Sequence, residues 1–104
     1  MEYINISNGI EQNVIISYGL TRYNFKIRFN DYFEYWYFDL YLYDTDTLVL
    51  AGIKLKLIYD CFEGLGLNLG KLYLEDTIND GSTINIKTDF GKRLKLLRDY
   101  TYVA

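Results

Sequence analysis

The fold of this chain is decided by residues 22–42, RYNFKIRFNDYFEYWYFDLYL. Two runs in this stretch place an apolar side chain at every second position: Tyr23, Phe25, Ile27 and Phe29, then Trp36, Phe38, Leu40 and Leu42. Because successive side chains of a β-strand point to opposite faces, this spacing predicts two long strands that share one buried face. The stretch therefore predicts a β protein.

The alternate positions of the second run form the opposite face of the same strand. They are Tyr35, Tyr37, Asp39, Tyr41 and Tyr43. A row of tyrosines suits contact with another molecule, because each ring adds apolar area and ends in a polar hydroxyl. Two other interpretations stay open: the tyrosines reflect β-propensity on a half-exposed face, or a second sheet covers them.

The segments on either side extend the sheet through tight turns. A strand at 14–18 precedes Gly19-Leu20, and glycine adopts the positive φ of a two-residue hairpin turn at low cost. The next connection spans 30–34 and the third spans 44–47. These turns predict the following facing pairs: Tyr18 with Thr21, Phe29 with Trp36, Lys26 with Asp39, Tyr37 with Lys54, Leu42 with Val49 and Tyr41 with Leu50.

The second half of the chain shows weaker patterns. The alternation stops after Leu57, and we expect a short helical turn near residues 58–63, with Gly64 as its terminator. Short strands are expected at 71–75, 84–86 and 93–100. The chain is therefore predicted to be all-β and mainly antiparallel, a small barrel or sandwich of about 6–8 strands. No proline blunts an edge strand, so closure or partner pairing is expected to protect the edges.

Length and composition bound the class of protein. The chain has 104 residues, of which 50% are hydrophobic and 18% aromatic, so residues 1–104 are interpreted as a single β domain. A net charge of -3 argues against binding through phosphate neutralisation. No stretch approaches the roughly 20 apolar residues of a membrane helix, and the N-terminus lacks the regions of a signal peptide. We therefore expect no membrane contact.

Catalytic and metal-binding chemistry finds little support in the residue types. The chain has no histidine, which removes the usual general base, zinc ligands and nucleophile triads, and it leaves the single Cys61 without an activating partner. The Asp44-Thr45-Asp46 turn lacks the glycine and distal glutamate of a helix-loop-helix calcium site. Gly64-Leu65-Gly66 lacks the lysine of a phosphate-binding loop. We predict a non-enzymatic protein with no catalytic residue, cofactor or metal.

The order of features along the chain is similar to that of a known family. The residues concerned are Gln12, Asn30, Trp36, the Asp44–Asp46 turn, Ala51-Gly52-Ile53, Leu65-Gly66, Phe90-Gly91, Leu94 and Tyr100. In this order, between Ile4 and Tyr100, the chain resembles the baseplate plug proteins of contractile-tailed cyanophages. The resemblance implies a structural virion protein, made in the cytoplasm of the bacterial host. It also implies a plug lodged among hub and spike proteins at the end of the tail tube in the baseplate, with an oligomeric arrangement there.

The predicted partner-binding surface lies on the tyrosine face. It consists of Tyr35, Tyr37, Tyr41, Tyr43, Leu48 and Leu50. Two alternative functions use the same face: a carbohydrate- or ligand-binding β module that stacks on the rings, and an OB-type binder of single-stranded nucleic acid. The second alternative would use the basic residues Arg22, Lys26, Arg28, Lys54 and Lys56. The preferred interpretation involves protein contacts and no specific nucleic acid.

Overall fold

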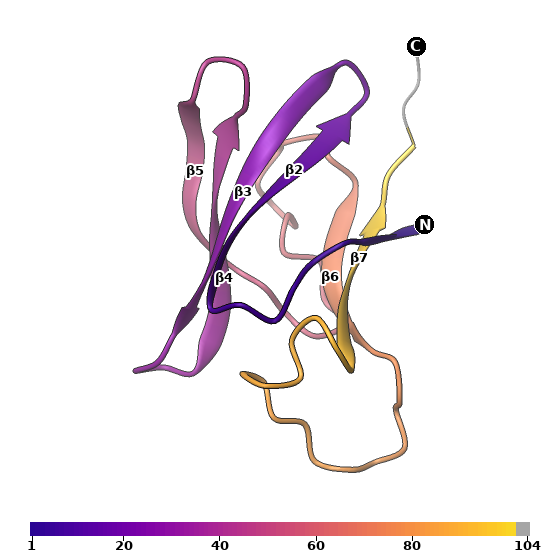
Figure 1. Ribbon diagram of the computed structural model, residues 1–104. Coiled ribbons are helices and arrows are strands. Elements are labelled where there is room, and N and C mark those ends of the chain that lie inside the picture. The colour runs from indigo at the N-terminus through magenta and orange to yellow at the C-terminus, as the bar shows by residue number, and fades with distance from the viewer. Residues whose placement is uncertain (102–104) are drawn as a thin grey trace.

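The computed structural model describes residues 1–101, which form seven β-strands and no helix. The strands are β1 (Glu2–Ile4), β2 (Glu11–Tyr18), β3 (Thr21–Asn30), β4 (Tyr35–Leu42), β5 (Thr47–Lys54), β6 (Lys71–Asp76) and β7 (Leu94–Asp99). They form two antiparallel sheets, with the orders β2-β3-β4-β5 and β1-β7-β6, which lie as separate layers in Figure 1. The all-β class is confirmed. Within residues 1–101 neither sheet closes into a barrel. Of the two predicted architectures, barrel and sandwich, the structure is therefore the sandwich.

The same residues include no helix long and apolar enough to cross a membrane.

The hydrophobic core lies between the two sheets. Of the eight alternating residues of β3 and β4 that were predicted to be buried, five have no exposed surface: Phe25, Ile27, Trp36, Phe38 and Leu40. The other three, Tyr23, Phe29 and Leu42, are partly buried. The second sheet contributes Leu72, Leu74 and Leu96 to the same cluster. The period-2 pattern therefore predicted correctly which face of the larger sheet packs inward.

The first two hairpins have the predicted register. Tyr18 faces Thr21 across a turn in which Gly19 has a φ of 63°. In the next hairpin Phe29 faces Trp36, and Lys26 faces Asp39 on the outer face. Here the hydrophobic pattern and the turn lengths agree, so the register is strongly specified.

The hairpin of β4 and β5 has the predicted register at one end only. Tyr37 faces Lys54 as predicted. Nearer the loop the observed pairs are Leu40 with Leu50, Tyr41 with Leu48 and Leu42 with Thr47. The predicted pairs of Leu42 with Val49 and Tyr41 with Leu50 are therefore wrong.

Two irregularities in β5 cause this difference. The pairing shifts between Phe38 and Leu40, and again between Leu40 and Tyr41, so β5 accommodates extra residues. At the first shift the Asp39 carboxylate accepts a hydrogen bond of 2.8 Å from the Gly52 amide, and Gly52 has a φ of 68°. Such bulges depend on contacts between a side chain and the backbone of the neighbouring strand, which an alternating pattern does not reveal.

Residues 58–63 form no helix, so the predicted helical turn is wrong. The Ile58 amide donates to the Leu74 carbonyl and the Cys61 amide donates to the Leu72 carbonyl, each at 2.8 Å. Because these amides bond to β6, they are unavailable to the carbonyls four residues earlier that a helix would use. The segment therefore covers the free edge of β6.

The remaining differences concern short elements. The predicted strands at 71–75 and 93–100 are confirmed as β6 and β7, but the stretch 84–86 is not a strand. It belongs to a long loop, residues 77–93, which extends below both sheets in Figure 1. β1 was not predicted, because three residues are too few to show a period.

Candidate functional site

The tyrosine row lies on the outer face of β4, away from the core. Tyr35, Tyr37 and Tyr41 are half-buried, and Tyr43 is 45% exposed. Tyr35, Tyr37 and Tyr41 alternate with Trp36, Phe38 and Leu40, which point inward, so the predicted outward placement of these three tyrosines is confirmed. Tyr43 directly follows β4 and is exposed.

Cations from the flanking elements lie over three of these rings. The Lys26 Nζ lies 4.2 Å from the centroid of Tyr41, and the Lys54 Nζ lies 5.1 Å from that of Tyr35. The Arg22 guanidinium lies 4.6 Å from the ring of Tyr43. Each pair gains a cation–π interaction, and the aliphatic stems of the lysines cover part of the rings. The face is therefore a mosaic of aromatic rings and positive charges.

The two leucines predicted for this surface lie on different faces. Leu48 faces Tyr41 and is 50% exposed, as expected for the outer face. Leu50 faces the buried Leu40 and packs against the core. Its predicted outward position is wrong, because the first shift in β5, between Phe38 and Leu40, turns Leu50 inward, and the second shift returns Leu48 to the outer face.

An aromatic group that the sequence interpretation missed extends the tyrosine row. Tyr32 and Phe33, in the connection between β3 and β4, are 87% and 69% exposed. Phe33 lies 6.5 Å from Tyr35, which in turn lies 6.0 Å from Tyr37, between ring centroids. Two consecutive aromatic residues inside a hairpin connection were the available signal, because neither has a position in the alternating core pattern.

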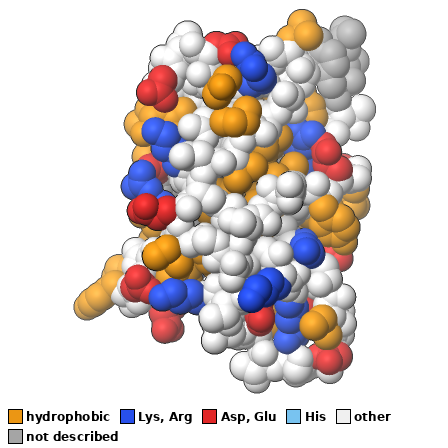
Figure 2. Space-filling view, in the orientation of Figure 1, with side chains coloured by type: hydrophobic (Ala, Val, Ile, Leu, Met, Phe, Trp, Pro, Cys, Tyr) orange, Lys and Arg blue, Asp and Glu red, His pale blue; other side chains and the backbone are white. Residues whose placement is uncertain are grey.

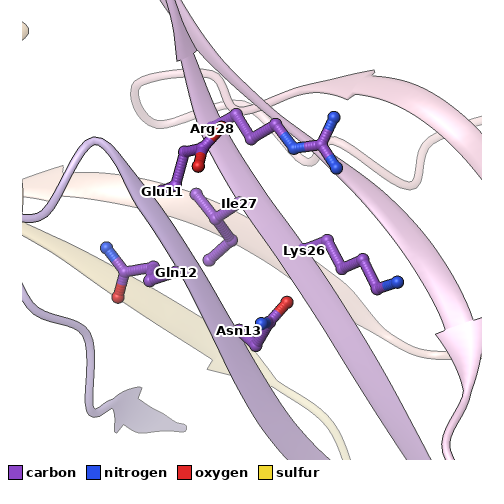
Figure 3. Close-up of a pocket in the computed structure, with 6 residues that line it drawn as sticks. All are labelled: Glu11, Gln12, Asn13, Lys26, Ile27 and Arg28. Carbon is purple, nitrogen blue, oxygen red and sulfur yellow. The ribbon is translucent and has the colours of Figure 1, made fainter.

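A shallow pocket of about 370 Å³ crosses β2 and β3 (Figure 3). It is lined by Glu11, Gln12, Asn13, Lys26, Ile27 and Arg28. In Figure 3 the long side chains of Lys26 and Arg28 extend over one face of the sheet, while Gln12 points the other way, where its amide bonds to the Ser7 backbone. The lining contains no pair of side chains arranged as an acid and a base.

The residues considered for chemistry serve structural roles in the described part of the chain. Burial raises the pKa of the Cys61 thiol to about 12, which keeps it protonated and unreactive at neutral pH. Asp44 forms an ion pair of 2.5 Å with Arg22. Residues 1–101 contain no group of three or more Cys, Asp or Glu side chains that could hold a metal ion.

Comparison with known proteins assigns the chain to a family. A family model described as "Cyanophage baseplate Pam3 plug gp18" matches residues 1–101. No curated protein matches the chain. The family match agrees with the resemblance seen in the order of Gln12, Asn30, Trp36 and the glycine positions, and with the all-β fold. The chain therefore belongs to the cyanophage baseplate plug family, whose members are structural components of the phage tail baseplate.

Proposed function

We propose that this chain, as a single β domain, plugs the hub and spike end of the tail tube and acts through protein contacts without catalysis. The membership of the baseplate plug family supports a structural role in the virion. Within that role, the outer face of β4 is the proposed contact with a neighbouring hub or spike protein. The contact residues are Tyr35, Tyr37, Tyr41, Tyr43 and Leu48.

The observation on which this proposal depends is the exposed mosaic of rings and cations. The aromatic residues project from a rigid sheet, whose inner face is held by the fully buried Trp36 and Phe38. Tyrosine and arginine are enriched at protein interfaces, where large rings and delocalised charges lose water together. Tyr43 and Arg22 form such a pair at one end of the row.

The same cations reduce the ring area on which sugars or bases could stack. Lys26, Lys54 and Arg22 each occupy one face of a tyrosine ring. A sugar or a base that stacks needs a free ring face. Binding to a glycan array, or salt-sensitive binding of single-stranded oligonucleotides, would contradict the proposed role of this face.

Substitution of two tyrosines tests the proposal. The double variant Tyr41→Ser, Tyr43→Ser should keep the melting temperature close to wild type, because both side chains lie outside the core, and should lose co-purification with hub and spike proteins. The matched control is Tyr59→Ser, Tyr73→Ser, which removes two tyrosines that lie outside the row, one of them 65% exposed and the other on β6. Unchanged co-purification of the first variant would disprove the proposed contact.

A further inference from the structure

The connection between β3 and β4 presents two aromatic side chains at the end of a projecting hairpin. Figure 1 shows this hairpin projecting at lower left, away from the second sheet, and Figure 2 shows hydrophobic side chains projecting from the surface there. Tyr32 and Phe33 occupy this connection and pack edge to face, with ring centroids 4.8 Å apart. In the described part of the chain, no other tyrosine or phenylalanine is as exposed as these two.

Hydrogen bonds hold this tip in one conformation. The Asn30 Oδ1 accepts hydrogen bonds of 3.0 Å from the amides of Tyr32 and Phe33, and the Asn30 carbonyl accepts one of 2.8 Å from Glu34. Glu34 has a φ of 56°, which closes the turn. Lys87 forms an ion pair of 2.8 Å with Asp31 and ties the tip to the 77–93 loop. An aromatic pair that is ordered before binding loses little conformational entropy when it enters a pocket.

The tip also presents a carboxylate. Asp31 is paired with Lys87, whereas Glu34 forms no ion pair within residues 1–101. A pocket that accepts the rings of Tyr32 and Phe33 would therefore bind the hairpin tip more tightly if it also placed a cation beside Glu34.

A pocket on the other sheet of this same chain has the matching chemistry. Its volume is about 420 Å³, and its lining consists of Tyr3, Ile4, Asn5, Ile6, Thr77 and Lys95. This volume lies within the range of about 300–1,000 Å³ that is typical of pockets enclosing small ligands. The Lys95 Nζ makes a long contact, of 3.4 Å, with the Gly91 carbonyl and forms no ion pair within residues 1–101. Glu75, which faces Lys95 across the sheet, accepts the Tyr3 hydroxyl at 3.2 Å.

The presence of carboxylates in the lining distinguishes four other pockets on the described surface from this one. Those four each include at least one carboxylate in the lining: Glu11 in one, Asp31 and Glu34 in a second, Asp60, Glu63 and Asp99 in a third, and Glu34 again in the fourth. An incoming Glu34 would meet a like charge in each of them, although two also hold a pair of cations, Lys26 with Arg28 in one and Lys54 with Lys56 in the other. The pocket beside Lys95 has no carboxylate in its lining.

We infer that Tyr32 and Phe33 of one copy insert into the Lys95 pocket of a second copy, with Glu34 paired to Lys95. The hairpin tip and the strands β1 and β7 lie on opposite sides of the molecule in Figure 1, so the tip cannot reach the pocket of its own chain. The contact is therefore head to tail, and each added copy leaves one tip and one pocket free for the next. This inference extends the proposed assembly role, and it is tested on the purified chain without hub or spike proteins.

Sedimentation of the wild-type chain provides the first test. The expected result is a concentration-dependent species heavier than the 12.3 kDa monomer. The variant Tyr32→Ser, Phe33→Ser should weaken self-association by about tenfold or more, as expected when a buried aromatic anchor is removed. The matched control is Leu20→Ser, which replaces a 91% exposed side chain at the tip of the β2–β3 hairpin and should leave self-association unchanged. A wild-type chain that stays monomeric at high concentration would overturn the inference.

Mixing two defective variants identifies the head-to-tail geometry. The tip variant keeps an intact pocket, and Lys95→Glu keeps an intact tip, so each alone should be monomeric and their mixture should form a one-to-one heterodimer. Because Lys95→Glu places a second carboxylate opposite Glu75, Lys95→Gln provides a milder variant, and thermal melting verifies that each is folded. A mixture that stays monomeric while wild type associates would show that the contact uses other residues. If the Tyr41→Ser, Tyr43→Ser variant still co-purified with hub and spike proteins while self-association stayed intact, the proposed function alone would be contradicted.

Discussion

Trp36 connects the larger sheet to the 77–93 loop through contacts with residues far away in the sequence. Its ring stacks on Phe90 with centroids 3.8 Å apart, and its Nε1 donates a hydrogen bond of 2.7 Å to the Ile86 carbonyl. Alternation in the sequence predicted that Trp36 would be buried. It could not predict these partners, because residues 86–90 show no alternation and reach the core from a loop.

Replacement of Trp36 by alanine should lower the free energy of unfolding by about 3–5 kcal/mol, through lost apolar contacts and the cavity that remains. Urea denaturation measures this difference. Leu20→Ala, at an exposed turn position, should change it by no more than about 0.5 kcal/mol. A loss below about 1 kcal/mol for Trp36→Ala would mean that the indole is not a core group.

At the scale of elements, one arginine organises the long 77–93 loop. The Arg93 guanidinium holds both Asp76 carboxylate oxygens, at 2.7 and 2.8 Å, and also binds Ser82 through its hydroxyl and its carbonyl. Only 9% of the Arg93 side chain and 12% of the Asp76 side chain are exposed. The sequence shows this loop as polar, but which arginine meets which aspartate depends on the pairing of β6 with β7.

This ion pair predicts a pH dependence of stability. The hydrogen bond from Arg93 holds the pKa of the Asp76 carboxyl well below its ordinary value of 3.8. The stabilisation is therefore complete above the unfolded pKa and is lost as the pH falls towards the lower folded value. The difference in free energy of unfolding between wild type and Asp76→Asn should be constant near neutral pH and shrink below about pH 4.

Chemical denaturation at several pH values measures that difference. The control is Asp31→Asn, which removes a carboxylate from an exposed ion pair with Lys87 and should have little effect at any pH. A difference for Asp76→Asn that stays the same at pH 3 and pH 7 would contradict the proposed linkage.

At the scale of the whole molecule, close backbone contacts join the beginning and the end of the chain. A Cβ on Gly91 would lie 2.6 Å from the Ser7 carbonyl oxygen, and one on Gly70 would clash with the Asp99 carbonyl. Two of the sheet edges are modified as well. The two irregularities interrupt the regular pairing of β5, and residues 56–61 form backbone hydrogen bonds along the free edge of β6. Because the chain has no proline to protect an edge strand, we expected either barrel closure or pairing with a partner to do so. In the described residues neither sheet closes into a barrel.

The close contact between Gly91 and the Ser7 backbone can be measured by comparison with Gly64, which has nearly the same backbone conformation. Gly91 has a φ of 78° and Gly64 has a φ of 77°, but a Cβ on Gly64 would meet nothing within 4 Å. Gly64→Ala should cost about 1–2 kcal/mol through backbone strain alone. Gly91→Ala should cost about 1–3 kcal/mol more, because the Ser7 backbone must move. Equal losses in thermal or urea unfolding would show that the contact with Ser7 contributes nothing.

Local alternation was sufficient to determine the β class, the buried face of β3 and β4, the register of two hairpins and the outward placement of three tyrosines on β4. Each of these depends on spacing along one strand or across one short turn. Tertiary structure decided the two shifts in β5, the inward position of Leu50, the bonding of residues 58–61 to β6 and the display of Tyr32 and Phe33. These features arise from contacts between segments distant in sequence, where a side chain or amide finds a partner that local spacing cannot specify.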